Sequence, residues 1–483
     1  MDASALARMQ FAFTVLYHYL FVPLSVGIGL IVAIMVTRVY RTRDARDEAR
    51  AQFWVKLFTA TFAVGVASGI TMEFSFGTNW AGYARFVGDI FGAPLAAEAL
   101  FAFFLESVFL GVLLFGRKRV SPKLYVASGW LVWGGSMLSS LWIIIANSWM
   151  QTPAGYEVVT DARGTRAVLT DFWAAAFNPT TVQRYFHTVI ALLILGAFVC
   201  MAVGALYLWR KRDVVSGKLF IKIGTIVGIV TAVIMLPAAH AQALAVAQNQ
   251  PAKLAALEGQ YETGPVDLSL FGWVDEESQQ TFALGIPGGT SFLIDQTFTT
   301  EFPGLNDFPA DERPDSINLI FQSYHAMVAL FGVICVTLVL GFVLMRGKLA
   351  GRRWPLVILM LAWLAPYLAI EFGWIVAEIG RQPWIVYNEL KTVDAVSQAV
   401  SPEQLMITLA LFMLVYLILF VGWVRVVVKT IKAGPAAFKA SEGTDGSADA
   451  AGLTFSSEGS TQAVDAAQAD DAVDAARDSG EVK

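Results

Sequence analysis

Long apolar segments alternate with short polar segments along most of the chain. A membrane-spanning helix needs roughly 20 predominantly apolar residues. Segments of this kind lie at residues 11–37, 53–80, 93–116, 124–147, 184–209, 219–240, 317–345, 354–379 and 403–428. The pattern therefore predicts an all-α integral membrane protein of about nine transmembrane helices. The second and eighth segments are the least purely apolar, so their boundaries are the least sharply defined.

The composition agrees with this class of protein. Of the 483 residues, 56% are hydrophobic and 15% are charged, and the mean hydropathy is +0.58. A soluble globular protein has roughly 25% charged residues. The apolar run after Gln10 is too long for a cleavable signal peptide. Cys200 and Cys335 lie in apolar segments, which argues against a disulfide framework or a cysteine-based metal site.

Basic residues predict the orientation of the helices. Clusters of Lys and Arg follow the first, third, fifth, seventh and ninth segments, whereas the alternate connections carry few basic residues. Cytoplasmic loops of membrane proteins are enriched in Lys and Arg. We therefore expect the N-terminus outside and the C-terminus in the cytoplasm.

The pattern of apolar segments and basic residues predicts three regions: a transmembrane domain at 1–433, an outer loop at about 241–316 within it, and a tail at 434–483. The loop contains turn-forming stretches and several aromatic residues, which favour an ordered structure. From Ser441 onward, ten acidic residues accompany two basic ones. A tail of this composition, with almost no aromatic residues, is expected to be disordered and cytoplasmic.

Ionisable side chains within the apolar segments are candidates for function, because burying them in a bilayer costs several kcal/mol. The histidines are His18, His187, His240 and His325, and the acids are Glu73, Glu98, Glu106, Glu371 and Glu378. At 1.5 Å per residue, five side chains from five segments fall in the outer half of the bilayer. These candidate metal ligands are His18, Glu98, His187, Met327 and Glu378.

Two pairs of carboxylates are stepped along single segments. Glu106 lies about 12 Å deeper than Glu98 and about 80° around an ideal helix, while Glu371 and Glu378 lie nearly on one face. Such carboxylates suit a proton path. Arg381, one turn beyond Glu378, could pair with that carboxylate or with an acidic group of a cofactor.

This pattern alone leaves three classes of protein open: a redox haem protein, a proton-coupled transporter, and a channel or structural subunit. An isolated histidine in a membrane helix is as often a hydrogen-bonded packing residue as a ligand. A single methionine such as Met327 usually fills space. The residue types are therefore suggestive without being decisive.

Seven stretches in a fixed order separate these classes. They are residues 8–18 (RMQFAFTVLYH), 71–80 (TMEFSFGTNW), 88–98 (GDIFGAPLAAE), 103–107 (FFLES), 146–151 (ANSWMQ), 250–258 (QPAKLAALE) and 380–384 (GRQPW). With these stretches the chain resembles subunit I of the cytochrome bd quinol oxidases from the first span to the ninth. Only the tail is unmatched.

The resemblance implies the catalytic subunit of a terminal oxidase in the bacterial cytoplasmic membrane. Such an enzyme oxidises quinol and reduces oxygen to water, separating charge across the membrane without a proton pump. The implied cofactors are a low-spin haem b, a high-spin haem b and haem d, with a further haem b in place of haem d as the alternative. The implied partners are a second large membrane subunit (subunit II) and a small single-helix accessory subunit, and no nucleic acid.

The resemblance also assigns the haem ligands. His187 and Met327 match the axial ligands of the low-spin haem b, a pair that suits fast electron transfer. His18 and Glu378 match the axial ligands of the two high-spin haems, and which haem each one holds stays open. Trp374 matches a position between haems.

The resemblance also assigns residues to proton transfer and to quinol oxidation. Glu98 matches a residue of the oxygen-reducing site, and Lys56, Glu106 and Ser139 match a path for protons from the inside. In the outer loop, Lys253 and Glu258 match residues of quinol oxidation. Glu258 can accept a proton from a quinol hydroxyl while Lys253 orients an oxygen. The sequence does not decide between ubiquinol and menaquinol.

One residue departs from the family pattern. The family commonly has Arg two residues before the methionine ligand, whereas this chain has His325. A neutral imidazole balances a haem propionate less well than a guanidinium group, which predicts a lower potential for the low-spin haem. An alternative is that His325 competes as an iron ligand. We assign no ligand role to His240.

Overall fold

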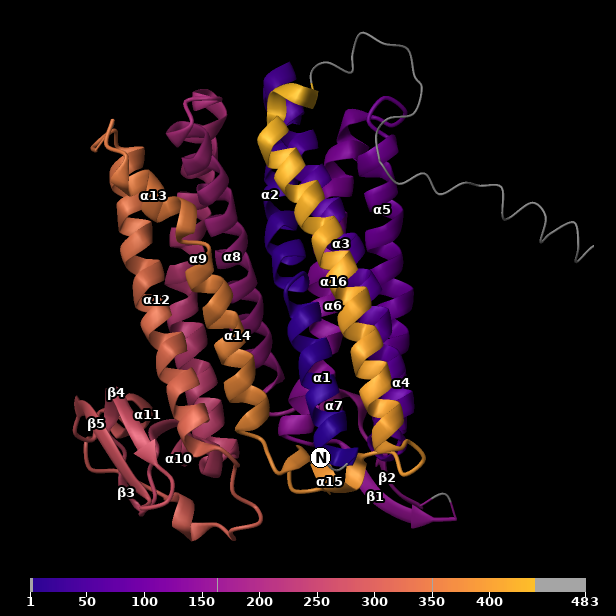
Figure 1. Cartoon of the computed structure of the whole chain (residues 1–483), viewed down its shortest axis with the longest axis vertical. Coiled ribbons are helices and arrows are strands. Elements are labelled where there is room, and N and C mark those ends of the chain that lie inside the picture. The colour runs from indigo at the N-terminus through magenta and orange to yellow at the C-terminus, as the bar shows by residue number, and fades with distance from the viewer. Residues whose placement is uncertain (1–2, 163, 350, 439–483) are drawn as a thin grey trace, which may run out of the picture. The chain divides into compact units, whose positions relative to one another are not determined.

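A computed structural model describes residues 3–162, 164–349 and 351–438. Within these residues, nine helical segments are long and apolar enough to cross a membrane, and Figure 1 shows them side by side. They are Ala3–Thr42, Ala45–Asn79, Ala81–Phe115, Pro122–Gln151, Thr181–Trp209, Val214–Asn249, Ile317–Met345, Trp354–Ile379 and Pro402–Ala433. The prediction of nine transmembrane helices is confirmed. Of the tail at 434–483 that we expect to be disordered, residues 434–438 are described and include a short 3₁₀ helix at Pro435–Phe438. The remainder of the tail lies outside the described residues.

The first predicted span consists of two helices, α1 (Ala3–Tyr19) and α2 (Val22–Thr42). The break falls at residues 20 and 21, and Pro23 follows in the first turn of α2. Proline suits the start of a helix because its missing N–H would have no partner there. The second span is α3 (Ala45–Asn79), whose first turn is capped by Asp44, which accepts a hydrogen bond from the Arg46 N–H at 2.9 Å.

The third span begins earlier than predicted. It consists of α4 (Ala81–Ala97), the π-helix η1 (Glu98–Phe103) and α5 (Phe104–Phe115), whereas the hydrophobic pattern placed its start at residue 93. Arg85 and Asp89 dilute the apolar character of the first three turns of α4. Those turns are stabilised instead by packing, for example of Phe91 on Trp149, whose ring centroids are 5.7 Å apart.

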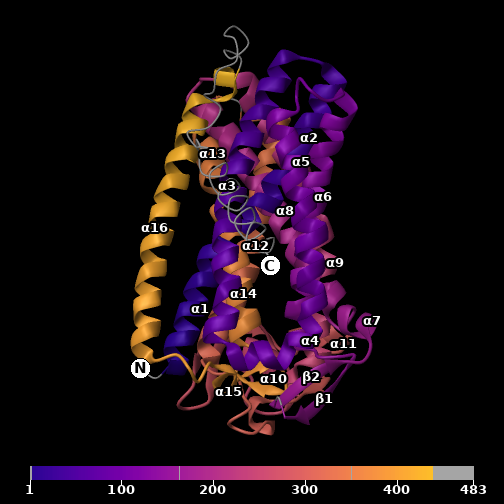
Figure 2. The ribbon, with the colours of Figure 1, turned by 90° about the vertical axis from the view of Figure 1, so that its right-hand side faces the viewer.

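The remaining spans are α6 (Pro122–Gln151), α8 (Thr181–Trp209), α9 (Val214–Asn249), α12 (Ile317–Met345), the pair α13 (Trp354–Leu361) and α14 (Leu364–Ile379), and α16 (Pro402–Ala433). At the crossing of α2 and α8, a Cβ added to Gly27 would lie 2.4 Å from the Leu192 carbonyl oxygen. Glycine is therefore required for this close approach. Figure 2 shows α16 at the edge of the bundle beside α1, where the rings of Tyr17 and Tyr416 stack at 4.0 Å.

The outer loop is folded. It contains α10 (Pro251–Glu258), the hairpin of β4 (Leu268–Asp275) and β5 (Gln280–Ile286), α11 (Gly289–Asp295), and the short pair β3 (Gly264–Pro265) and β6 (Glu301–Phe302). A 3₁₀ turn, η2 (Leu305–Asp307), precedes α12. The sequence placed the start of the loop at residue 241, but α9 continues as a helix to Asn249.

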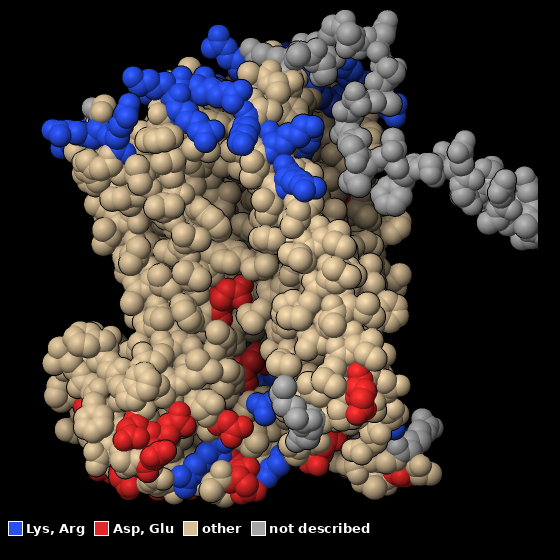
Figure 3. All heavy atoms as spheres, in the orientation of Figure 1, with Lys and Arg blue, Asp and Glu red and all other residues tan. Residues whose placement is uncertain are grey.

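Smaller elements lie at the same end of the bundle as this loop (Figure 1). They are the hairpin of β1 (Tyr156–Asp161) and β2 (Gly164–Leu169), α7 (Phe172–Ala176), the pair β7 (Trp384–Val386) and β8 (Leu390–Lys391), and α15 (Thr392–Ala395). The short helix η3 (Pro435–Phe438) follows α16 and packs on α3. In Figure 3, Lys and Arg dominate one end of the visible face, the other end carries acidic residues with a few basic ones, and the belt between them shows few charged groups.

Candidate functional site

Helices α12 and α14 meet at Met327. A Cβ added to Gly373 of α14 would lie 3.2 Å from the Met327 sulfur atom of α12, so glycine leaves room for that side chain. The next residue, Trp374, packs edge-on against Tyr19 of α1 with ring centroids 5.1 Å apart. On α8, His187 has a buried Nδ1 atom that forms no hydrogen bond within the described part of the chain.

The imidazole of His18 is oriented by α3. Its Nδ1 atom lies 2.9 Å from the Ser68 hydroxyl, which in turn lies within hydrogen-bond distance of the Val64 carbonyl oxygen. A carbonyl oxygen only accepts, so the Ser68 hydroxyl donates to it and accepts from His18 Nδ1–H. The Nε2 atom of His18 then carries the lone pair. This is the arrangement in which a histidine presents Nε2 to a metal.

The carboxylate of Glu378, at the end of α14, is held by two side chains. Asn147 of α6 donates to Oε1 at 2.9 Å, and Arg381 pairs with Oε2. The buried Arg184 lies behind Asn147, with 3.5 Å between Nη1 and Oδ1. Two buried guanidinium groups therefore accompany one carboxylate, which leaves an excess of positive charge.

These residues fit a haem group. The Nε atoms of Arg184 and Arg381 and the Nδ1 atom of His187 are all buried without a hydrogen-bond partner among the residues placed by the structure. Orphaned buried donors are rare in proteins. The carboxylate substituents of a haem are suitable partners for guanidinium groups, and His and Met are typical axial ligands of haem iron.

A second group of carboxylates lies on η1 and α5. Ser139 of α6 donates to Glu98 at 2.9 Å, and Ser136, one turn earlier, donates to the buried Glu106 at 2.5 Å. Glu98, Glu106 and Ser139 are thus brought together. Lys56 is not joined to them by any hydrogen bond in the described ranges; its ammonium nitrogen lies 5.8 Å from the centre of the Phe438 ring.

Lys253 of α10 is buried and fully hydrogen-bonded. Its ammonium group donates to the side-chain oxygens of Gln151 and Gln250, at 2.6 and 2.7 Å, and to the Ala377 carbonyl oxygen at 3.2 Å. Burial, helped by the positive charges of Arg184 and Arg381, lowers the pKa of Lys253 well below its usual value. These hydrogen bonds join the outer loop to α14 at the backbone of Ala377, the residue before Glu378.

Glu258, the last residue of α10, lies at a junction between the loop and α12. Thr290 donates to Oε1 at 3.1 Å and the Ser269 N–H points to Oε2 at 3.4 Å. The Nε2 atom of His325 lies 3.6 Å from Oε2. The imidazole of His325 is therefore turned toward the outer loop and Glu258.

Several residues of these networks were not singled out by sequence reasoning: Ser68, Ser136, Asn147, Gln151, Arg184, Gln250, Ser269 and Thr290. Asn147, Gln151 and Gln250 belong to the stretches that carry the family resemblance. Arg184 is a charged residue one turn before His187. These signals identify the residues as candidates but not their partners. The fourth histidine, His240, is exposed on α9.

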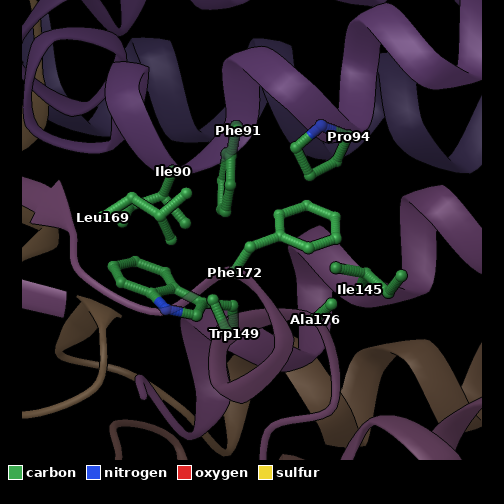
Figure 4. Close-up of a pocket in the computed structure, with 9 residues that line it drawn as sticks. Ile90, Phe91, Pro94, Ile145, Trp149, Leu169, Phe172 and Ala176 are labelled. Carbon is green, nitrogen blue, oxygen red and sulfur yellow. The ribbon is translucent and has the colours of Figure 1, made fainter. Parts of the chain in front are cut away.

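A small pocket lies between α4, α6, β2 and α7. Figure 4 shows its lining, which is entirely apolar: Ile90, Phe91, Pro94, Ile145, Trp149, Leu169, Phe172, Ala175 and Ala176. The absence of polar groups from this lining leaves it without catalytic chemistry of its own. The candidate functional site is instead the set of buried histidines, carboxylates and arginines.

This fold and this site define a multi-pass membrane protein with buried histidines, carboxylates and arginines, a class in which such residues mark cofactor sites or proton paths. A family model described as cytochrome bd terminal oxidase subunit I matches residues 6–435. The chain therefore belongs to the cytochrome bd terminal oxidase subunit I family. Members of this family are respiratory-chain oxidoreductases, and the chain is a multi-pass protein of the bacterial inner membrane.

Individual relatives agree with this assignment. The chain is 36% identical to cytochrome bd ubiquinol oxidase subunit 1 of Bacillus subtilis, covering 90% of this chain and 94% of that protein. It is 34% identical to cytochrome bd-II ubiquinol oxidase subunit 1 of Escherichia coli, covering 92% and 99%. A solved bd oxidase from Geobacillus thermodenitrificans matches with a TM-score of 0.82 and 28% identity, covering 90% of this chain and 99% of the other.

Proposed function

We propose that this chain is the catalytic subunit of a bd-type terminal oxidase that oxidises membrane quinol and reduces oxygen to water. The relatives are named as ubiquinol and menaquinol oxidases. One observation carries the proposal most directly. The ammonium group of Lys253 bonds to the Ala377 carbonyl oxygen, so the proposed quinol site adjoins the helix that carries Glu378.

The proposed cofactors are a low-spin haem b, a high-spin haem b and haem d, with a further haem b as the alternative to haem d. His187 and Met327 would hold the low-spin haem, and His18 and Glu378 the two high-spin haems. Arg381 would bind a haem carboxylate, and Trp374 would lie between haems. When bound, the haems carry electrons from quinol to oxygen.

Quinol oxidation is assigned to the outer loop. A quinol loses its hydroxyl protons as it loses electrons, and Glu258 would accept one of these protons. Lys253, held at three oxygen atoms, would orient a quinol oxygen by its charge. Because the loop is assigned to the outer face, the protons would be released outside.

Oxygen reduction consumes protons, which are proposed to come from the inside. Lys56, Glu106, Ser139 and Glu98 are the residues assigned to this path. The hydrogen bonds of Glu98 and Glu106 to α6 support the inner part of the path. Releasing protons on one side and consuming them on the other separates charge without a proton pump.

The proposed orientation places the N-terminus outside and the tail at 434–483 in the cytoplasm, with residues 1–433 as the transmembrane domain. The enrichment of Lys and Arg at one end of the visible face (Figure 3) supports this orientation, since basic residues mark the cytoplasmic side. The outer loop at about 241–316 is then the quinol-binding region.

The proposed partners are subunit II and a small single-helix accessory subunit. Exposed apolar side chains such as Phe115 of α5 and Ile418 of α16 suit contact with another membrane helix or with lipid. Subunit II is implied by the names of the relatives, which are called subunit 1.

The test is the absorption spectrum of the purified complex. We expect visible absorption. A pyridine haemochrome should report either haem b together with a chlorin, or haem b alone. Oxygen consumption with a quinol as electron donor should accompany the spectrum. A colourless, folded complex would contradict the proposal and favour a proton-coupled transporter.

A further inference from the structure

The imidazole of His325 and the carboxylate of Glu258 face each other across a narrow gap. Both residues are buried, with 8% and 5% of their surfaces exposed, although they belong to different parts of the fold. The 3.6 Å between Nε2 and Oε2 is too long for a hydrogen bond. The Nε2 atom has no hydrogen-bond partner within the described residues, so a buried polar atom points at the proposed proton acceptor without being satisfied.

The hydrogen bond on the other side of the ring determines which nitrogen carries the proton. The Nδ1 atom of His325 lies 2.8 Å from the Phe321 carbonyl oxygen. A carbonyl oxygen only accepts, so Nδ1 carries a hydrogen atom. In the neutral ring, Nε2 is therefore an acceptor. It faces a carboxylate, which is also an acceptor, so the gap is suited to a group that donates.

The ring cannot easily turn away from the gap. It packs on Phe321, with ring centroids 4.1 Å apart, and edge-on against Tyr324 at 5.2 Å. The carboxylate of Glu258 is held from the loop side by Thr290 and by the Ser269 N–H. Both members of the pair are thus preorganised by neighbours, as expected of a binding site rather than of mobile surface groups.

We propose that His325 is a quinol-binding residue: its Nε2 atom and the Glu258 carboxylate together bind one hydroxyl group of the quinol. This inference rests on the proposed function, which assigns Glu258 to quinol oxidation. The quinol hydroxyl donates a hydrogen bond to the pair. The carbonyl group of the product quinone has no proton to donate and is bound less well, so the pair distinguishes substrate from product.

The position of Lys253 is consistent with this arrangement. Lys253 lies five residues before Glu258 on α10, about 7.5 Å along the helix axis. The three donors of its ammonium group are taken by Gln151, Gln250 and the Ala377 carbonyl oxygen, whereas the gap between His325 and Glu258 is lined by acceptors. A quinol hydroxyl that donates is therefore bound in the gap rather than by a hydrogen bond from Lys253.

Two variants of the assembled oxidase test the role of each ring nitrogen. An asparagine side chain reaches about as far as Nδ1 of histidine, and a glutamine side chain reaches about as far as Nε2. H325N therefore keeps the bond to the Phe321 carbonyl oxygen and loses the contact beside Glu258. H325Q places an amide beside Glu258 instead, and is the matched control.

With duroquinol as the probe, H325N should raise KM about tenfold, the effect of losing one hydrogen bond. We expect kcat at saturating quinol to change little and H325Q to restore most of the affinity. The spectrum of the dithionite-reduced enzyme should be unchanged in both variants. A structural defect would instead lower kcat and haem content together.

A binding measurement tests the distinction between quinol and quinone directly. Reduced enzyme cannot accept electrons from duroquinol, and oxidised enzyme has none to give to duroquinone. Anaerobic calorimetry can therefore measure the Kd of duroquinol on the reduced enzyme and that of duroquinone on the oxidised enzyme. The wild type should bind the quinol more tightly, and H325N should reduce this preference. Thr290→Val, in the loop rather than in α12, provides a second variant because it frees the Glu258 carboxylate to turn away from His325.

An unchanged KM and an unchanged preference in both H325N and Thr290→Val would overturn the inference while leaving the proposed function intact. A haem-free wild-type complex that oxidises no quinol would overturn the proposed function itself. The two failures are therefore distinguishable in the same set of preparations.

Discussion

Glu98 and Glu106 accept hydrogen bonds from the same helix, α6, although eight residues of ideal α-helix would place them about 80° apart. The cause is the π-helix η1, which begins at Glu98. A π-helical turn accommodates about one extra residue. The pair therefore behaves as if separated by about seven α-helical residues, or about 20°. Both carboxylates can then face Ser136 and Ser139.

This geometry makes Ser136 a positioning residue for the proposed proton path. Ser136→Ala removes the hydrogen bond to the buried Glu106, and we expect turnover to fall roughly ten- to a hundredfold, the effect of losing a hydrogen bond to a charged group. The KM for quinol should stay the same, because the quinol site lies in the outer loop. Oxygen consumption at saturating quinol measures the effect.

The control is Ser140→Ala. Ser140 lies one residue beyond Ser139 and donates to the Ser136 backbone carbonyl at 2.8 Å, without contacting either carboxylate. Its loss should leave turnover nearly unchanged. Equal effects of the two substitutions would mean that Glu106 does not depend on its serine partner.

The sequence predicts the nine spans because each one is a continuous apolar stretch long enough to cross a bilayer. It misses the start of α4, because Arg85 and Asp89 interrupt the apolar pattern and tertiary packing stabilises the helix instead. It also misses η1, since residues 98–103 are apolar enough for an ordinary helix. Only the hydrogen bonds of Glu98 and Glu106 to α6 reveal the changed register.

The candidate site is predictable in its residue types but not in its contacts. Lys253 and Gln151 are separated by 102 residues, yet their side chains lie 2.6 Å apart. No local pattern contains this relationship. His325 is a second example. In the sequence it lies two residues before Met327, but in the structure its imidazole lies beside Glu258. Tertiary folding, rather than helix periodicity, determines both pairs.

The proposed ligands of the low-spin haem can be tested by substitution. His187→Ala and Met327→Leu each remove one axial ligand, so each should abolish the low-spin signal in the reduced-minus-oxidised spectrum and leave the high-spin haems largely in place. His240→Ala is the matched control, because His240 is exposed on α9. Persistence of the low-spin signal in both ligand variants would show that the assignment is wrong.

The potential of the low-spin haem offers a separate test of His325. We expect His325→Arg to raise this potential, because a guanidinium group near a haem carboxylate stabilises its negative charge. Potentiometric titration of the purified oxidase measures the change. An unchanged potential would contradict the prediction and show that residue 325 does not act on the haem.

Lys253 should make the stability of the protein depend on pH. Burial lowers its pKa in the folded protein, whereas the unfolded chain keeps the ordinary value of 10.5. Between these two values the unfolded chain binds more protons than the folded protein, so this group makes stability rise with pH. Below the lowered pKa the destabilising effect is complete.

We therefore expect the unfolding midpoint of the wild type to rise, relative to that of Lys253→Met, as the pH increases toward the ordinary lysine value of 10.5. Thermal scans at a fixed rate in one detergent measure the difference. Lys391→Met is the control, because Lys391 pairs with the exposed Asp311 at 2.7 Å. The pKa of Lys391 is raised by that partner, so its contribution has the opposite sign. Parallel curves for the wild type and Lys253→Met would contradict the prediction.

Glu371 tests whether an unsatisfied carboxyl group is retained for function. Both of its carboxylate oxygens are buried and neither has a hydrogen-bond partner among the described residues. Replacing such a group with an apolar side chain of similar size removes a desolvation cost of about 1–3 kcal/mol. Glu371→Met should therefore raise the unfolding midpoint of the assembled complex. If the carboxyl group moves protons, turnover should fall roughly a hundredfold or more in the same variant.

Glu371→Gln, which keeps the shape but cannot ionise, should slow turnover with little gain in stability. A lower unfolding midpoint with normal turnover in Glu371→Met would instead show that the carboxyl group serves a structural role, because only a stabilising partner makes its loss costly.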